Sequence, residues 1–256
     1  MTRTSLYGKK GLVVGIANDQ SIAWGCARAL RAAGAELAAT WQNDKARPHV
    51  QPLLKQLEVA IQAPLDVSRP GELEALFEAI TTQWGQLDFL VHSIAFAPRA
   101  DLHGRVADCS AEGFAQAMDL SCHSFIRMAR LAEPLMKSGG SLMTMSYLGA
   151  AEVLPGYGMM GPVKAALESS VRYLASELGA NDIRVNAISP GPLATRAASG
   201  LPDLGGLLDD SARRAPLRRP FDIDDVGDLC AFIASDAARA ITGGTLYVDG
   251  GVHILN

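Results

Sequence analysis

The chain has 256 residues, of which 48% are hydrophobic and 20% are charged, a composition typical of a globular protein rather than a disordered one. Its formal net charge of −4, from 23 basic and 27 acidic residues, gives no general attraction to nucleic acid or to anionic membranes. The only basic cluster, Arg213, Arg214, Arg218 and Arg219, is more typical of a solvated surface than of a phosphate-binding patch.

The cysteines and the apolar runs indicate the compartment. Cys26, Cys109, Cys122 and Cys230 lie far apart without metal-binding or redox spacing, so we expect free thiols in a reducing compartment and no metal site. No apolar run approaches the ~18 residues of a membrane span. The first apolar run, residues 11–17, offers no cleavage site for a signal peptide. These features predict a cytoplasmic protein.

Short β-rich runs alternate with helical patterns along the whole chain. We expect strands at 11–16, 36–41, 60–65, 87–92, 141–146, 184–189 and 245–248. We expect helices at 21–33, 72–84, 111–137, 157–178 and 224–235, with a charged amphipathic segment after the second strand. Because no linker interrupts this alternation, the chain is predicted to be one α/β domain over 1–256, a Rossmann-type doubly wound parallel sheet with helices on both faces. The long loop that follows Gly191 is a candidate substrate-binding lid, at about 193–215.

The end of the first strand is a candidate cofactor site, because doubly wound sheets bind ligands beyond the carboxyl ends of their strands. It lacks the G-x-G-x-x-G pattern but has one close-approach glycine, Gly15, and a hydroxyl at a helix N-terminus, Ser21. Together these two residues suit a pyrophosphate, which the exposed N–H groups and the dipole of the helix would hold. The alternative is a tight turn in which Ser21 is an ordinary helix N-cap.

The ends of the next two strands indicate which dinucleotide fits. Gln42 and Asn43 leave the second strand end uncharged until Asp44, and no arginine follows it directly, so NADH is favoured over NADPH. Asp66 and Val67 close the third strand, where a carboxylate can read an adenine edge. The alternative for Asp66 is a turn aspartate.

Tyr157 and Lys164 are the candidate catalytic pair. Seven residues of helix bring two side chains back to one face, two turns apart. A phenol beside an ammonium, which favours its ionisation, suits a reaction that builds negative charge on a substrate oxygen. The alternative is a half-buried tyrosine and a solvated lysine that merely share a helix.

Several motifs in order resemble one family. The chain resembles the divergent branch of the short-chain dehydrogenase/reductases and, more narrowly, the bacterial NADH-dependent enoyl-[acyl-carrier-protein] reductases, over residues 6–254. The motifs that carry the resemblance are Gly15-x5-Ser21-x-Ala23, Trp41–Lys45, His92–Ala95, Ser146–Gly149, Tyr157-x2-Met160-x3-Lys164, Asn186–Pro192 and Val248–Gly251.

The resemblance implies NADH-dependent reduction of a trans-2-enoyl thioester in fatty acid biosynthesis. It implies that Tyr157 donates a hydrogen bond to the thioester oxygen and that Lys164 holds the hydroxyls of the nicotinamide ribose. It also implies that Tyr147 is an accessory or gating residue. It places at the cofactor Gly15, Ser21, Ile22, Gln42, Asp66, Val67, Ile94, Lys164, Leu193, Ala194, Thr195, Arg196 and Ala197. It places in the acyl pocket Phe96, Ala97, Met160, Ala198, Leu201 and Leu207. It also implies a homotetramer packed through 111–137 and 157–178.

The spacing before Lys164 distinguishes enoyl reduction from ketone reduction. Ordinary members of the superfamily carry Tyr-x3-Lys, but here Met160 stands four residues before Lys164 and has no proton to give. Tyr157 lies three residues earlier, about 4.5 Å along a helix. In ketone reduction the hydride adds to the carbon that bears the oxygen, whereas in enoyl reduction it adds two carbons away from that carbon. The stabilised oxygen then lies further from the nicotinamide, which fits the displaced tyrosine. Asp119 also stands where ordinary members have a catalytic asparagine.

Other activities stay open. The expected lid stretch 201–208 has no basic residue to dock an acidic carrier protein, and only Arg196, Arg213 or Arg214 would compensate. The alternatives are a coenzyme A thioester or a specialised acyl chain as substrate, a carbonyl or alcohol oxidoreductase on the same fold, and a nucleotide-binding protein that has lost its catalysis.

Overall fold

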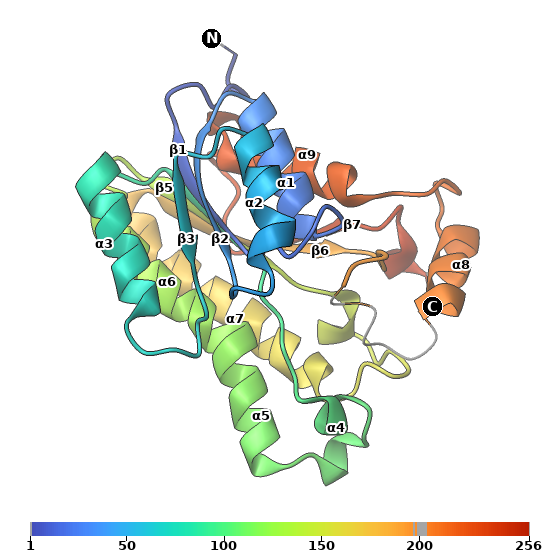
Figure 1. The fold of residues 1–256 in the computed structure, drawn as a ribbon. Helices are drawn as coiled ribbons and strands as arrows, with labels where there is room; N and C mark the ends of the chain where they lie inside the picture. Colours follow the sequence, from blue (N-terminus) through green and yellow to red (C-terminus); the bar gives the residue numbers. More distant parts are fainter. Residues whose placement is uncertain (1, 197, 199–203, 256) are drawn as a thin grey trace.

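A single parallel sheet lies at the centre of the computed structural model, which describes residues 2–196, 198 and 204–255 (Figure 1). Within these residues the sheet has seven strands in the order β3-β2-β1-β4-β5-β6-β7, so the strand order reverses between β1 and β4. The strands are β1 Lys10–Val14, β2 Glu36–Trp41, β3 Ile61–Pro64, β4 Phe89–His92, β5 Gly140–Met145, β6 Ile183–Pro190 and β7 Thr245–Val248.

Helices cover both faces of the sheet. Alternate strand residues point to opposite faces, so Val13 packs under α1, α2 and α9, whereas Leu12 and Val14 pack under α3, α6 and α7 (Figure 1). The helices are α1 Ile22–Ala32, α2 Arg47–Gln56, α3 Glu72–Trp84, α4 Arg99–Leu102, α5 Ala111–Met118, α6 Ser124–Ala132, α7 Met160–Leu178, α8 Leu204–Arg214 and α9 Ile223–Ala234. In the part of the chain that is described, no helix combines the length and the apolar character needed to cross a membrane.

Two glycines let α1 and α9 touch backbone to backbone. A Cβ on Gly25 would lie 2.1 Å from the carbonyl oxygen of Ile223, and a Cβ on Gly227 would lie 2.4 Å from that of Gly25. Asp222 starts α9 with a capping box in which its side chain accepts from Asp224 and Asp225 N–H groups. The first helix and the last helix are therefore held at a fixed separation.

The structure confirms the predicted fold class. The strands β2 and β7 and the helix α3 have the predicted ends, and the other predicted strands, with α1 and α9, agree within two residues. The charged segment after β2 forms α2. The candidate lid contains α8, whereas residues 197 and 199–203 lie outside the described residues.

Two predicted helices were wrong in part. The helix expected at 111–137 is divided into α5 and α6 by a π-helical turn, Asp119–His123, which holds more residues per turn than an α-helix. The helix expected from Tyr157 begins only at Met160, because Gly158 has a left-handed φ of +52°. Tyr157 therefore lies in the turn before α7 and not on a helical face shared with Lys164.

Candidate active site

Tyr157 lies against a second tyrosine at the carboxyl end of the sheet. Tyr147 comes from the segment just after β5, and its ring centroid is 4.9 Å from that of Tyr157, edge to face at 61°. The short turn Leu148–Ala150 packs directly on the Tyr157 ring, since a Cβ on Gly149 would lie 2.3 Å from it. Neither phenolic hydroxyl has a hydrogen-bond partner among the described residues. Both are thus free to donate to a ligand.

Both phenols stay protonated at neutral pH. Burial raises the pKa of Tyr147 to about 12. Burial also raises the pKa of Tyr157 well above its usual value, and the charges of Tyr147 and Glu168 raise it further. The expectation that the ammonium of Lys164 favours ionisation of Tyr157 was therefore wrong, because desolvation dominates. A protonated phenol still suits donation of a hydrogen bond to a developing oxyanion.

Lys164 is buried rather than solvated, with 4% of its surface exposed. Its Nζ donates a hydrogen bond of 2.6 Å to the carbonyl oxygen of Met145, the last residue of β5. Burial lowers the pKa of Lys164 to about 8, and the charges of Cys122 and Glu168 oppose that shift. An ammonium has three N–H donors, so two remain for a ligand as far as the described chain goes. The interpretation of Lys164 as a solvated lysine was wrong.

A small apolar cluster adjoins Tyr157 and contains two of the predicted acyl-pocket residues. Met160 is 5% exposed and packs with Val163 at the start of α7, and Ala97 packs against the same cluster. Phe96, also predicted there, has a side chain 42% exposed. Its backbone is fixed by Ser121, whose Oγ accepts from Phe96 N–H and donates to Phe96 carbonyl oxygen at 2.8 and 2.9 Å.

A narrow hollow of about 80 Å³ joins Tyr147 to α8. Leu207, a predicted acyl-pocket residue, lines this hollow from α8, and Leu154 and Pro192 line it from neighbouring segments. Ala198 is half-buried, and its N–H donates to Thr195 Oγ1 at 3.1 Å. The predicted residues Ala197 and Leu201 lie outside the described part of the chain. The helix in the candidate lid thus faces one of the two tyrosines.

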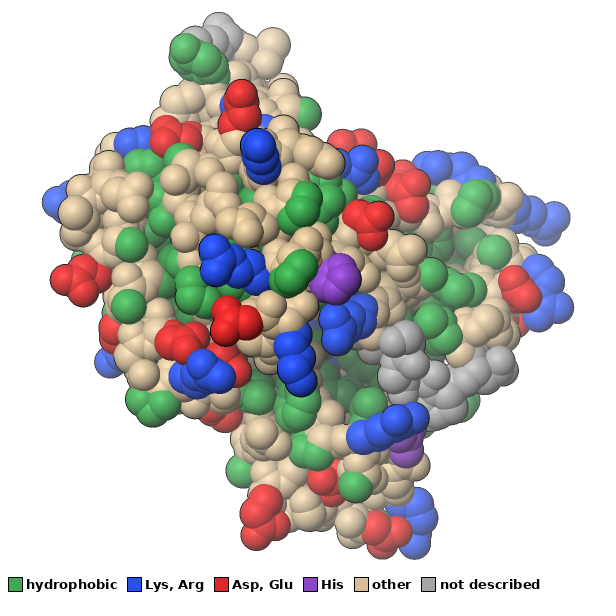
Figure 2. All heavy atoms as spheres, viewed as in Figure 1, with side chains coloured by type: hydrophobic (Ala, Val, Ile, Leu, Met, Phe, Trp, Pro, Cys, Tyr) green, Lys and Arg blue, Asp and Glu red, His purple; other side chains and the backbone are tan. Residues whose placement is uncertain are grey.

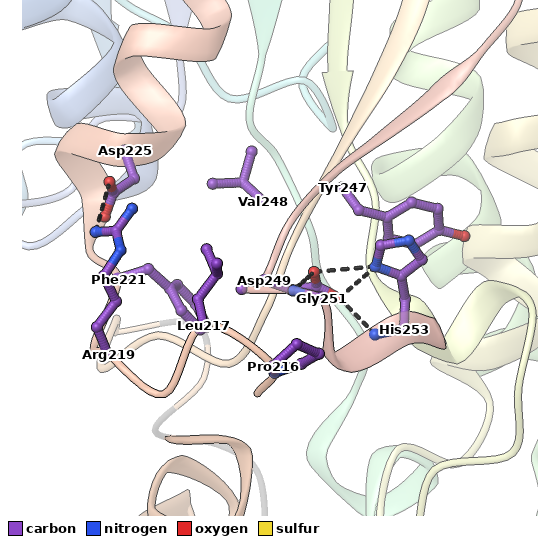
Figure 3. A pocket seen from close by; sticks show the side chains of 11 residues that line it. Pro216, Leu217, Arg219, Phe221, Asp225, Tyr247, Val248, Asp249, Gly251 and His253 are labelled. Atoms are coloured by element: carbon purple, nitrogen blue, oxygen red, sulfur yellow. Dashed lines mark hydrogen bonds and ion pairs between the residues drawn. The ribbon is translucent and has the colours of Figure 1, made fainter. Parts of the chain in front are cut away.

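A larger hollow of about 420 Å³ (Figure 3) is lined by neither Tyr147 nor Tyr157. It is formed by the end of β7, the segment that leads from α8 to α9, and the start of α9. Figure 3 shows Tyr247 stacked on His253, with ring centroids 3.9 Å apart, and His253 hydrogen-bonded to Asp249. Asp249 also lines the narrow hollow, so it forms the wall between the two.

The turn after β1 uses its side chains internally. Gly15 has a φ of +108°, and a Cβ there would lie 2.1 Å from the carbonyl oxygen of Ser93. Ser21 Oγ accepts from the N–H groups of Ala17 and Asn18, both at 3.0 Å, and donates to Asn18 Oδ1. The N-cap interpretation was right about its position, but its side chain caps no N–H of α1.

Two backbone N–H groups at this end are free to bind a ligand, as far as the described residues show. Among the described residues, the N–H groups of Ile22 and Ala23, the first two of α1, have no partner. They lie beside the switch in strand order between β1 and β4 and at the positive end of the helix dipole. The site therefore fits the pyrophosphate of a dinucleotide through the exposed N–H groups of the helix N-terminus, whereas the Ser21 hydroxyl is used within the turn.

The other predicted cofactor residues lie along the same edge of the sheet. Asp66 is a turn aspartate, because its Oδ1 accepts from Ser68 N–H at 3.0 Å and from Ser68 Oγ at 2.6 Å. The carbonyl oxygen of Val67 accepts from Arg127 at 3.0 Å. Gln42 is exposed after β2 and Ile94 is half-buried after β4. The segment after β6 places Leu193 buried, Thr195 half-buried, and both Ala194 and Arg196 exposed.

Three further polar side chains, His92, Ser146 and Glu168, lie near Lys164. No role was assigned to them from the sequence, although His92 and Ser146 each begin one of its motifs. His92 is fully buried between Thr144 Oγ1 at 2.9 Å and Ser124 Oγ at 2.8 Å. Burial, followed by the charge of Lys164, lowers the pKa of His92 to about 3, so His92 is neutral. Ser146 Oγ donates to Glu168, one turn after Lys164 on α7. The spacing of Lys164 and Glu168 was the available signal.

Asp119 does not take the place of a catalytic asparagine. Its carboxylate pairs with His123 Nδ1 at 3.0 Å and with Arg127 Nη2 at 3.5 Å. His123 lies on the π-helical turn and Arg127 lies on α6, and the side chain of Asp119 is 47% exposed. The difference from ordinary members at this position is thus a surface ion pair.

A doubly wound parallel sheet with free helix N–H groups at its switch point defines a dinucleotide-binding protein, and the buried lysine and free phenols beside it define an oxidoreductase site. A family model described as enoyl-(acyl carrier protein) reductase matches residues 15–253. The chain belongs to this family. The resemblance found in its motifs is therefore confirmed.

Curated relatives and solved structures agree with that assignment. The chain is 46% identical over 248 residues to enoyl-[acyl-carrier-protein] reductase [NADH] 1 of Rhizobium meliloti, covering 97% of this chain and 91% of the relative. It is 47% identical to the FabI enzyme of Nostoc sp., covering 98% of each. It is similar, with a TM-score of 0.94 and 45% identity, to the Anaplasma phagocytophilum reductase in complex with NAD, covering 98% and 96%. It is also similar to the Bacillus cereus reductase with NADP+ and indole naphthyridinone, at a TM-score of 0.96 and 44% identity, covering 98% of each.

Proposed function

We propose that the protein is an NADH-dependent enoyl-[acyl-carrier-protein] reductase that converts a trans-2-enoyl thioester to the saturated acyl thioester. The observation that carries this proposal is the Tyr157 phenol, which is protonated, has no partner among the described side chains and lies against Tyr147. Family membership and the buried Met160 in the position four before Lys164 support enoyl reduction over ketone reduction.

The backbone and Lys164 would hold the dinucleotide. The N–H groups of Ile22 and Ala23 suit its pyrophosphate, and the two remaining N–H donors of Lys164 suit the hydroxyls of the nicotinamide ribose. The other residues proposed at this site are Gly15, Ser21, Gln42, Asp66, Val67, Ile94, Leu193, Ala194, Thr195 and Arg196. When bound, NADH supplies the hydride that adds to the β-carbon of the substrate.

The phenols act on the oxygen end of the substrate. As negative charge develops on the thioester oxygen, the Tyr157 hydroxyl donates a hydrogen bond to it. The enolate then takes a proton from solvent at its α-carbon. Because burial keeps the pKa of Tyr157 high, the phenol holds its proton and acts as a fixed donor. Tyr147 packs edge-on against that ring and fixes its orientation. Ala97, Met160 and Leu207 line the path for the acyl chain.

The test of this proposal is Tyr157→Phe, which removes the hydroxyl and keeps the ring. With crotonyl thioester and NADH, we expect turnover to fall by about 100-fold, because the loss of one oxyanion donor typically costs that much. Tyr7→Phe is the matched control, since Tyr7 is 72% exposed and precedes β1, far from Tyr157 in the sequence. A fall of less than about tenfold, or turnover of simple ketones in place of the enoyl thioester, contradicts the proposed role.

We propose acyl carrier protein as the carrier of the acyl chain. Arg213, Arg214, Arg218 and Arg219 are all exposed at and after the end of α8, and Figure 2 shows basic side chains gathered at that edge of the molecule. Asp210 lies 3.4 Å from Arg213 and 3.3 Å from Arg214, which reduces the positive charge of the cluster. An acidic carrier would dock against the cations that remain.

Charge reversal distinguishes the two carriers. We expect the double variant Arg213→Glu and Arg214→Glu to raise KM for the enoyl thioester of acyl carrier protein by about tenfold and to leave KM for the coenzyme A thioester unchanged. Arg172→Glu on the exposed side of α7 is the control. An unchanged KM for the carrier-protein thioester would favour coenzyme A as the carrier.

We propose a homotetramer packed through α5, α6 and α7. Tyr173 on α7 is 70% exposed and Phe114 on α5 is 40% exposed, and large apolar side chains in such positions favour association. Sedimentation equilibrium measures the assembly directly, and a mass of one chain at micromolar concentration would rule it out.

A further inference from the structure

The end of β5 is bonded to α7 at two successive residues. The carbonyl oxygen of Met145 accepts from Lys164 Nζ at 2.6 Å, and the hydroxyl of the next residue, Ser146, donates to Oε1 of Glu168. Ser146 is 4% exposed, and its N–H donates to the carbonyl oxygen of Ile188 on β6 at 2.7 Å. Lys164 and Glu168 lie one helical turn apart, so the two hydrogen bonds lie next to each other between the end of β5 and α7.

The residue that follows Met145 and Ser146 is Tyr147. It follows Ser146 directly and packs edge-on against Tyr157. A shift of Ser146 therefore moves both the acceptor of Lys164 and the tyrosine that orients Tyr157. Glu168 thus acts, through Ser146, on the Met145 carbonyl and on Tyr147, although it lines neither of the two hollows described above.

Glu168 is also the carboxylate that acts on Lys164. The other titratable groups around the ammonium are His92 from β4, which is neutral, and Cys122 from the π-helical turn, whose pKa burial raises. In the ranges that the structure describes, no ion pair within 4 Å joins Lys164 to Glu168, so the carboxylate acts through space. Its charge opposes the effect of burial, which lowers the pKa of Lys164 to about 8.

We propose that Glu168 is a positioning residue for this reaction: its hydrogen bond fixes Ser146 and hence Tyr147, and its negative charge, one helical turn from Lys164, stabilises the ammonium. The inference rests on the proposed function, because it assigns Lys164 and Tyr147 their roles there. A purely structural role, in which Glu168 only ties α7 to β5, predicts no change in the titration of Lys164.

Two variants separate the charge from the hydrogen bond. Glu168→Gln removes the charge and keeps an oxygen that accepts from Ser146, whereas Ser146→Ala removes the hydrogen bond and keeps the charge. Glu168→Asp is the conservative variant, which keeps the charge on a shorter side chain. Glu177→Gln, an exposed position further along α7, is the matched control.

The measurement is the titration of Lys164 Nζ by 15N NMR in the protein without nucleotide, with the signal assigned by its loss in Lys164→Met. We expect Glu168→Gln to lower the midpoint by at least about half a pH unit, because removal of a nearby negative charge favours the neutral amine. We expect Ser146→Ala, Glu168→Asp and Glu177→Gln to leave the midpoint in place. The affinity for NADH, followed by fluorescence, should weaken at a lower pH in Glu168→Gln than in the parent.

The hydrogen-bonded half of the proposal has its own readout. We expect Ser146→Ala to lower kcat for the enoyl thioester several-fold, with the Lys164 midpoint unchanged. An unshifted midpoint in Glu168→Gln, or an equal shift in Glu177→Gln, overturns the proposal, as does an unchanged kcat in Ser146→Ala. If the parent reduces no enoyl thioester with NADH, the proposed function fails, while the midpoints still report on Glu168.

Discussion

The pyrophosphate end and the tyrosine end of the site offer different kinds of hydrogen-bond donor: backbone N–H groups at the first and side-chain hydroxyls at the second. At the pyrophosphate end, the hydroxyl of Ser21 and Oδ1 of Asp66 form hydrogen bonds within local turns, and the backbone N–H groups of Ile22 and Ala23 have no partner among the described residues. At the tyrosine end, the free groups are side chains, the hydroxyls of Tyr147 and Tyr157. Both ends are built from short polar segments at the carboxyl edge of one sheet.

The difference follows from what each end must recognise. A pyrophosphate is a fixed anion, and a helix N-terminus offers it N–H groups that need no side chain to hold them. An oxyanion that appears only during the reaction needs one donor at one point, and a phenol fixed by packing supplies it. We therefore expect backbone changes to damage the pyrophosphate end and side-chain changes to damage the tyrosine end.

The largest effect is expected from Gly15→Ala, which would break the pyrophosphate end through its backbone. The new Cβ would lie 2.1 Å from the carbonyl oxygen of Ser93, at a φ of +108° that L residues rarely adopt. We expect the affinity for NADH to fall at least about 100-fold and the free energy of unfolding to fall by about 3 kcal/mol. Isothermal calorimetry and urea unfolding measure the two quantities. Gly179→Ala, with open space around it, is the control, and retained affinity in Gly15→Ala would refute the backbone account.

Lys164→Met is expected to have the next largest effect, and it should abolish turnover while it raises the free energy of unfolding. The pKa of Lys164 is lowered from 10.5 to about 8, chiefly by burial, so protonation of the folded state costs stability. This cost is full below pH 8 and disappears as the pH rises from 8 to 10.5. We expect Lys164→Met to raise the free energy of unfolding at pH 7 by about 1 to 3 kcal/mol while it abolishes turnover.

Urea unfolding at pH 7 and at pH 10.5 tests the sign for Lys164. The gain should shrink at the higher pH, whereas Lys137→Met, at an exposed lysine, should change stability by less than about 0.5 kcal/mol at both. A loss of stability at pH 7 would mean that the hydrogen bond to Met145 outweighs the burial of the charge.

The smallest effect is expected from Asp66→Asn, which sharpens the comparison at the pyrophosphate end. An asparagine oxygen still accepts from Ser68, so the turn persists. We expect the dissociation constant for NADH to change by less than about threefold. A rise of more than tenfold would show that the carboxylate reads the adenine edge, as the sequence also allowed.

The fold was predictable because its signals are local. The alternation of buried strands with amphipathic helices requires only neighbours in sequence, and in α3 the apolar residues Leu73, Leu76, Phe77 and Ile80 are all buried. The interruption of the helix expected at 111–137 was not predictable, because a π-helical turn shows no clear change in apolar spacing. The late start of α7 depends on the backbone angles of Gly158.

The residues of the candidate site were predictable from the sequence, but their contacts, their burial and the resulting pKa shifts were not. Tyr157 and Lys164 were found by spacing on a helix that does not include Tyr157. The contacts that hold them join residues far apart in sequence, such as Ser146 with Glu168 and Met145 with Lys164. The burial that raises the pKa of one and lowers that of the other is a property of the folded chain. No local sequence pattern contains information on these contacts or on this burial.

The contact between α1 and α9 limits where the molecule can flex. Because Gly25 and Gly227 leave no space between the two backbones, the start of α9 cannot slide or tilt without displacing the helix whose N-terminus faces the cofactor. Any movement of α8 relative to α9 must then be taken up between Ala215 and Asp222, the segment that joins the two helices.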